Sequence, residues 1–172
     1  PTSFVVHEGK GAWIGHPTEL GDVLDKIKAG KFDAKAVAAE REAREAENKK
    51  MQAAMGPVFA AAGAGDFAKA VAELDKALAE NPKWEPRGAT LKLDLLRNKS
   101  EEEYYAYAKK LADGIYKDDS MMLNQIAWSI VEDDSGLKKP DYAMAIQVAT
   151  RASELTKNEN SMILDTLAFA YF

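Results

Sequence analysis

An internal repeat constrains the fold of this chain more than any other feature of its sequence. Residues 66–71 (DFAKAV) are echoed by residues 141–146 (DYAMAI), an offset of 75 residues. Residues 104–109 (YYAYAK) lie between them, at offsets of 37 and 38 residues. A helical pattern precedes each of the three segments, and turn residues separate that pattern from the segment. Helix–turn–helix units with such a period predict an α-solenoid, in which each pair buries its apolar stripe against its neighbours.

Composition supports a mostly helical chain. Alanine occurs 30 times and charged residues make up 30% of the sequence, so the chain is rich in residues that favour helices. We place the repeats at residues 49–172, with residues 161–172 as the first helix of a fourth pair. Four small residues recur where helices should cross closely: Ala70, Ala77, Ala145 and Ala152.

The N-terminal part of the sequence follows a different pattern. Residues 4–7 and 12–15 are runs of β-formers separated by a glycine-containing turn, which predicts a hairpin. An apolar stripe at helical spacing follows and ends at Gly30, so residues 1–32 should form a hairpin with one helix. Residues 33–48 read as a charged connecting helix, because charged side chains dominate its second half.

Composition also excludes several kinds of function. The sequence contains no cysteine, so it has no thiol nucleophile, disulfide or cysteine-ligated metal. Its net charge of −5 argues against binding to nucleic acid. No apolar run is long enough to span a bilayer. The acidic turns at residues 117–120 and 132–136 lack the spacing of a calcium loop, and no catalytic serine motif or phosphate-binding loop is present. We therefore predict no cofactor, no metal and no catalytic residue within the chain.

Tyrosines and histidines are the remaining candidates for a site. A tyrosine cluster could line a groove for a protein or peptide partner, or it could belong to the core of the stacked helices. Its members are Tyr104, Tyr105, Tyr107 and Tyr116. His7 and His16 have no neighbouring ligand pattern, and we expect structural or solvent-facing roles for both.

Residues 63–82 resemble the second helix of a tetratricopeptide repeat, with Ala70 as the small crossing residue and Phe67 as the groove filler. Residues 164–171 are similar to the first helix of such a repeat. The spacing exceeds the usual period of this family, so the resemblance is to a degenerate form. It implies a module that binds a protein or peptide.

Residues 1–17 resemble the second half of a thioredoxin-like fold of the TlpA and redoxin type. In that family a cis-proline followed by threonine opens a strand, and the next strand ends near an aromatic–x–Gly pattern. Pro1 and Thr2 match the first feature, and Trp13 with Gly15 matches the second. The resemblance implies a partial thioredoxin-like fold whose C-x-x-C motif lies upstream of Pro1.

Together these observations predict a mainly α chain with a short hairpin and helix followed by a solenoid of helix pairs. The resemblances imply part of a thiol-disulfide oxidoreductase, with redox cysteines outside the chain and an appended protein-interaction module. The alternative is a non-enzymatic scaffold for a protein or peptide. A periplasmic location follows only from the thioredoxin resemblance. The first residue is Pro1 and the last helical pattern has no cap, so we expect a longer parent chain.

Overall fold

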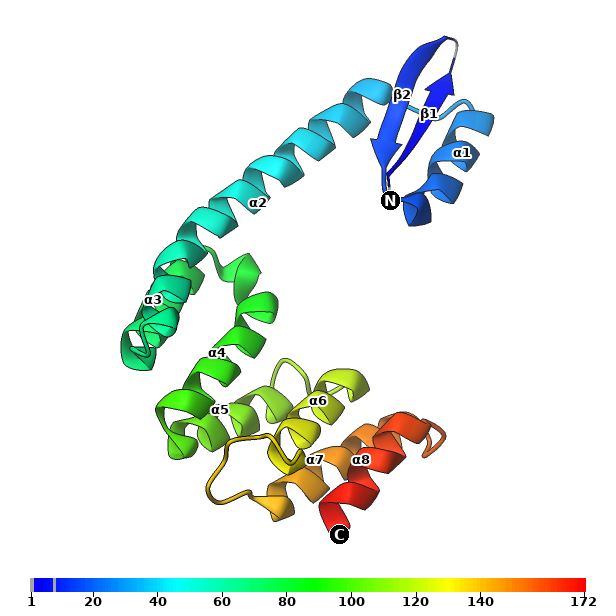
Figure 1. The fold of residues 1–172 in the computed structure, drawn as a ribbon. Helices are drawn as coiled ribbons and strands as arrows, with labels where there is room; N and C mark the ends of the chain where they lie inside the picture. Colours follow the sequence, from blue (N-terminus) through cyan, green and yellow to red (C-terminus); the bar gives the residue numbers. More distant parts are fainter. Residues whose placement is uncertain (1, 8) are drawn as a thin grey trace. The chain divides into compact units, whose positions relative to one another are not determined.

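The computed structural model describes residues 2–7 and 9–172 (Figure 1). Pro1, which the thioredoxin resemblance matches to a cis-proline, lies outside the described residues. The chain divides into two compact units, Pro1–Ala54 and Met55–Phe172. A two-stranded hairpin precedes the helices, and the described residues are mainly helical. This confirms the predicted fold class.

The first unit opens with an antiparallel hairpin of β1 (Ser3–His7) and β2 (Lys10–Gly15). Gly9 lies in the turn with a φ of 74°, a conformation that glycine adopts at little cost. The pairing register shifts between Val5 and Val6. A short 3-10 helix (Pro17–Glu19) and α1 (Leu20–Lys28) follow, in the place where the apolar stripe predicted a helix.

The two faces of the hairpin differ in burial. Phe4 and Ile14 are paired across the strands and are 74% and 53% exposed. Trp13 lies on the other face and is only 7% exposed. Gly15 leaves room for this indole ring, because a Cβ at this position would clash with the ring. The aromatic–x–Gly pattern thus has a packing reason in this chain.

Helix α2 (Ala34–Gly63) is a continuous helix of 30 residues. The boundary that we placed between residues 48 and 49 falls inside it, so the charged segment and the next helical pattern form one element. Pro57 lies within the helix, where it removes one backbone donor. The division between the two units also falls in α2, after Ala54.

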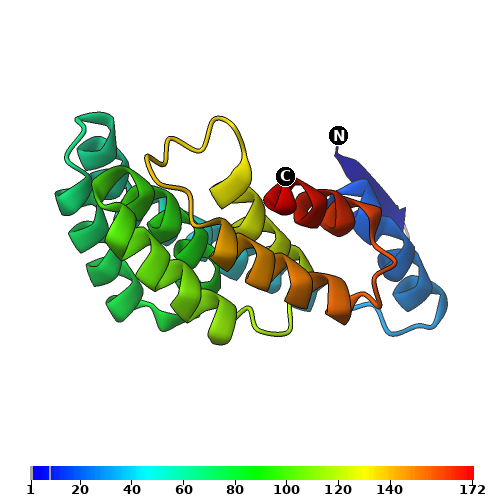
Figure 2. The ribbon, with the colours of Figure 1, turned by 90° about the horizontal axis from the view of Figure 1, so that it is seen from below.

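Six further helices form the rest of the second unit. They are α3 (Phe67–Glu80), α4 (Glu85–Lys99), α5 (Glu101–Asp113), α6 (Ser120–Val131), α7 (Tyr142–Leu155) and α8 (Ser161–Tyr171), with a 3-10 turn (Pro82–Trp84) before α4. Helix α4 packs against both α3 and α5. At the C-terminal end α6, α7 and α8 contact one another, and Figure 2 shows them side by side in yellow, orange and red.

The repeated residues begin α3 and α7, whereas in α5 they lie further along the helix. Ala70, Ala108 and Ala145 are fully buried in α3, α5 and α7. The repeated aspartate is an N-cap: Asp66 accepts a hydrogen bond from the backbone N–H of Lys69 at 3.0 Å, and Asp141 caps α7 in the same way. In α3 and α7 the repeat therefore encodes a helix start followed by a buried alanine, and in α5 it encodes the buried alanine alone.

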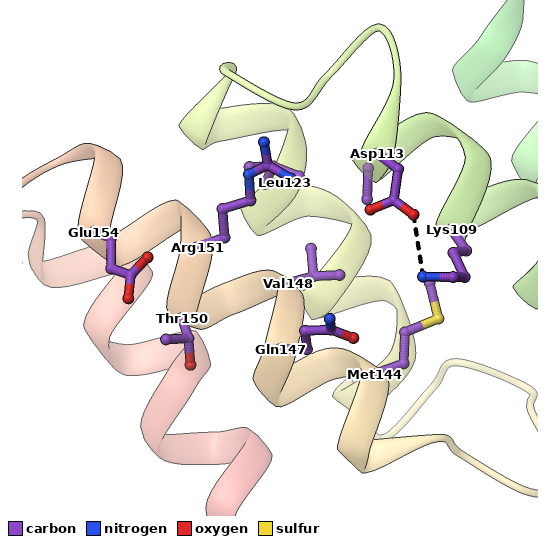
Figure 3. A pocket seen from close by; sticks show the side chains of 10 residues that line it. Lys109, Asp113, Leu123, Met144, Gln147, Val148, Thr150, Arg151 and Glu154 are labelled. Carbon is purple, nitrogen blue, oxygen red and sulfur yellow. Dashed lines mark ion pairs between the residues drawn. The ribbon is translucent and has the colours of Figure 1, made fainter.

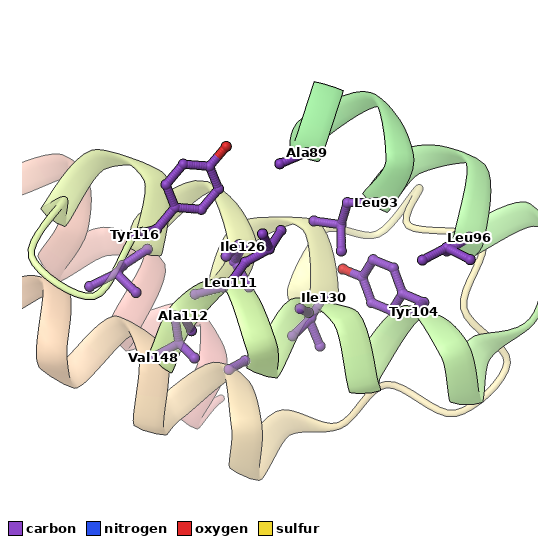
Figure 4. Packing of buried hydrophobic residues seen from close by; sticks show 14 of the residues in the cluster. Ala89, Leu93, Leu96, Tyr104, Leu111, Ala112, Tyr116, Ile126, Ile130 and Val148 are labelled. Carbon is purple, nitrogen blue, oxygen red and sulfur yellow. The ribbon is translucent and has the colours of Figure 1, made fainter. Parts of the chain in front are cut away.

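A hydrophobic core runs through the second unit (Figure 4). Tyr104 on α5 is 1% exposed and lies among side chains of α4 and α6, including Leu93 and Ile130. The core continues to Val148 on α7. This packing fixes the positions of α6, α7 and α8 and therefore of the surfaces that they form.

Candidate functional site

An apolar groove lies between α6 and α8. It encloses about 400 Å³, and we call it the α6–α8 groove. Its apolar lining consists of Met121, Met122 and Trp128 on α6 and Met162 on α8. Trp128 remains 38% exposed and Met162 is 58% exposed. The groove therefore presents large apolar side chains to solvent.

The sequence of α6 explains why the groove is apolar. Leu123, Ile126 and Ile130 on this helix are buried, with at most 1% of their surface exposed. Met121 and Trp128 are also apolar but lie on the exposed side. A helix that is apolar on more than one side is normally buried or forms an interaction surface. In this structure the second apolar side of α6 lines the groove.

The polar side chains that line the groove are Asn124, Gln125, Asp165 and Thr166. Asn124 is 6% exposed, and its side-chain oxygen accepts no hydrogen bond from any residue that the structure describes. Thr166 is also buried, but its hydroxyl donates to the carbonyl of Met162 at 3.1 Å. Asp165 is exposed and carries the only charge among the described residues that line the groove. The site thus offers one exposed carboxylate beside an apolar surface, whereas the unpartnered oxygen of Asn124 is closed to solvent.

Three of the four candidate tyrosines connect secondary-structure elements through their hydroxyl groups. The Tyr104 and Ser129 hydroxyls lie 2.8 Å apart and link α5 to α6. The Tyr105 hydroxyl donates to the carbonyl of Lys139 and accepts from the N–H of Asp141, both at 3.0 Å. The Tyr116 hydroxyl donates to a backbone carbonyl at the start of α4 at 2.9 Å. Because Tyr104 and Tyr116 are buried in the core, the four side chains do not line one surface.

Tyr107 has a different environment. It is half-buried beside a second hollow lined by residues of α3, α4 and α5. The ammonium group of Lys92 lies over its ring, 5.0 Å from the centroid, and also pairs with Asp75. Burial raises the pKa of Tyr107 to about 12, and the carboxylate of Glu85 acts in the same direction. The phenol is therefore held neutral and contributes to packing.

The other predicted site residues lie in the first unit. Thr2 is exposed and precedes β1. His7 ends that strand. The ring nitrogen Nδ1 of His16 lies 2.9 Å from the hydroxyl of Thr18 and caps the short helix that follows, as expected of a structural histidine. Among residues 2–7 and 9–172, no group of three acidic or histidine side chains is arranged to hold a metal ion.

No helix in the described part of the chain combines the length and the hydrophobicity needed to cross a membrane.

Comparisons with protein-family models, with curated proteins and with solved structures gave no match to this chain. Its candidate site therefore stands on the chemistry of its own residues.

Sequence reasoning did not identify the groove residues as a site. A signal was present, because residues 121–131 contain apolar side chains on every side of the helix and only one amphipathic stripe is needed for the core. This excess of apolar side chains indicates a second apolar surface on the helix, but it does not tell which residues form that surface. No comparable signal exists for Asn124, since its lack of a partner depends on the surrounding helices.

Proposed function

We propose that this chain is a helical scaffold that binds a protein partner by holding an apolar, basic segment of it in the α6–α8 groove. The observation that carries the proposal is the exposure of Trp128 and Met162 along one hollowed surface. Tryptophan is enriched among the residues that dominate binding energy. Methionine adapts its shape to different apolar partners. Such a lining suits a short segment with several apolar side chains.

Charge supports the basic character of the partner segment. Asp165 is the only charged lining residue of the groove within the described chain. A lysine or arginine opposite this carboxylate would add attraction and fix the orientation of the bound segment.

The experiment that tests this proposal is selection of short random peptides on the full chain, followed by binding measurements on the selected peptides. We expect sequences that combine apolar residues with lysine or arginine. Trp128→Ala should weaken their binding by about 10-fold or more, the usual effect of removing a central aromatic anchor. Asp165→Asn should weaken the binding of the basic peptides and reduce its dependence on salt.

Phe59→Ala serves as the matched control. Phe59 is 58% exposed on α2, so this variant removes an exposed aromatic side chain outside the groove. It should bind the selected peptides as wild type does. If the peptides bind Trp128→Ala as tightly as wild type, or if selection yields no binding peptide, the groove is not the site.

A second candidate function is participation in a thioredoxin-like redox domain. It is favoured by the apolar face of the hairpin, where Phe4 and Ile14 are largely exposed and would suit further strands or helices. The chain has no cysteine, so the thiols would have to lie elsewhere in the protein. A C-x-x-C motif upstream in the parent reading frame is the expected finding, and its absence would remove this candidate. The chain alone should not reduce insulin disulfides, because no thiolate is present.

A further inference from the structure

A cavity of about 330 Å³ opens between α5 and α7, and we call it the α5–α7 cavity (Figure 3). Its apolar floor consists of Ala112, Leu123 and Val148, which are 5%, 0% and 6% exposed. The half-buried Met144 also lines it. Ligand sites commonly enclose about 300–1,000 Å³, so this cavity fits a small apolar group. It shares no residue with the α6–α8 groove.

Charged side chains surround this floor. Lys109 and Asp113 form an ion pair of 3.1 Å on α5, so these two charges largely offset each other (Figure 3). Arg151 and Glu154 line the cavity from α7 and form no ion pair with each other. The polar side chains of Gln147 and Thr150 complete the α7 side. The charges left available to a ligand are thus a guanidinium and a carboxylate.

Arg151 differs from the comparable arginine of this chain. Arg97 is also half-buried, and it pairs with the carboxylate of Glu132 at 3.2 Å. The guanidinium of Arg151 makes no ion pair or hydrogen bond to any residue in the part of the chain that the structure describes. A partly desolvated guanidinium favours a planar anion, because its N–H groups match the two oxygens of a carboxylate. Arg151 therefore supplies an anion-binding group beside an apolar floor.

We propose that the α5–α7 cavity binds an α-carboxylate that adjoins an aliphatic side chain. Arg151 holds the carboxylate, and the floor formed by Leu123 and Val148 receives the aliphatic group. Two sources share this chemistry: a free aliphatic amino acid and the C-terminal residue of a peptide. A free amino acid also carries an ammonium group, which suits the carboxylate of Glu154.

Titration of the full chain with leucine, N-acetyl-leucine and leucinamide, followed by amide NMR shifts, tests the proposal. Leucine or N-acetyl-leucine should shift resonances of α5 and α7 at concentrations up to about 10 mM, a range that detects even millimolar affinity. Leucinamide lacks the carboxylate and should bind about 10-fold more weakly. Tighter binding of leucine points to a free amino acid, and equal or tighter binding of N-acetyl-leucine points to a peptide C-terminus.

Variants of Arg151 complete the experiment. Arg151→Gln should weaken binding of the preferred ligand by about 10-fold, and Arg151→Lys should fall between it and wild type because a lysine cannot bind both oxygens in the same plane. Arg87→Gln removes the same charge from the exposed surface of α4 and should bind as wild type does. Matching thermal unfolding curves will show that each variant is folded. The proposal fails if leucinamide binds as well as the acids, if Arg151→Gln binds normally, or if neither acid binds.

Discussion

The indole ring of Trp128 packs against the phenyl ring of Phe169, with the ring centroids 5.6 Å apart and the planes inclined by 59°. This contact joins α6 to α8 beside the α6–α8 groove. Both rings remain partly exposed, at 38% and 42%. The aromatic pair therefore fixes one wall of the groove before a partner binds, and this reduces the entropy that binding must overcome.

The exposure of Trp128 predicts a fluorescence signal for the groove. Trp13 and Trp84 are 7% and 3% exposed, so acrylamide should quench mainly Trp128. Trp128→Phe should remove most of the quenchable emission and keep the fold. A peptide selected on the groove should protect the wild-type chain from quenching. An unchanged quenching constant in Trp128→Phe would mean that the groove is closed in solution.

The unpartnered side-chain oxygen of Asn124 leads to a prediction about stability. This oxygen is buried without a partner, which costs about 1–3 kcal/mol relative to an apolar side chain of similar shape. Asn124→Leu should therefore raise the free energy of unfolding by about 1 kcal/mol. Urea unfolding of the variant and of wild type provides the measurement.

Thr166→Val is the control for Asn124→Leu. Thr166 is also buried, but its hydroxyl already donates to a carbonyl, so its removal should not stabilise the chain. Equal stability changes in both variants would show that the Asn124 oxygen is satisfied in solution.

The burial of Ala70 leads to a prediction about how much a larger side chain at a close helix crossing destabilises the fold. It is fully buried in α3, and Ala70→Leu should lower the free energy of unfolding by about 1–3 kcal/mol through overpacking. Ala68→Leu on the exposed side of α3 should change it by less than about 0.5 kcal/mol. Chemical unfolding of the two variants compares them directly. A similar small effect at both positions would place Ala70 on the surface and would contradict the repeat register.

The repeat could be predicted from sequence because its signals are local. An N-capping Asp66 or Asp141, a small residue four positions later and helical periodicity all act within a few turns. The hairpin was equally accessible, since glycine and β-formers determine it over a few residues. The length of α2 was not, because the charged segment before residue 49 and the more apolar pattern after it differ in composition, although one helix contains both.

The sites depend on contacts between helices, and sequence patterns do not record these. The apolar residues of α6 do not reveal whether Leu123 or Trp128 faces the core. Arg151 and Glu154 have the spacing of a helical ion pair, yet they do not pair in the structure. The sequence left two alternatives open for the tyrosines, a groove or the core, and the structure places Tyr104 and Tyr116 in the core with their hydroxyls bonded within the chain.

Tyr107 predicts a loss of stability at alkaline pH. Burial raises its pKa from the ordinary value of 10.0 to about 12, and it also raises the pKa of Tyr104 and Tyr105. The unfolded chain therefore releases the Tyr107 proton at a lower pH than the folded chain does. The stability that the neutral phenol contributes is complete below pH 10 and is lost as the pH rises toward 12. Urea unfolding across this window should show a smaller pH-dependent loss in Tyr107→Phe than in wild type, because the variant has one titrating group fewer. Parallel losses in the two proteins would mean that Tyr107 is as accessible to water in the folded chain as in the unfolded one.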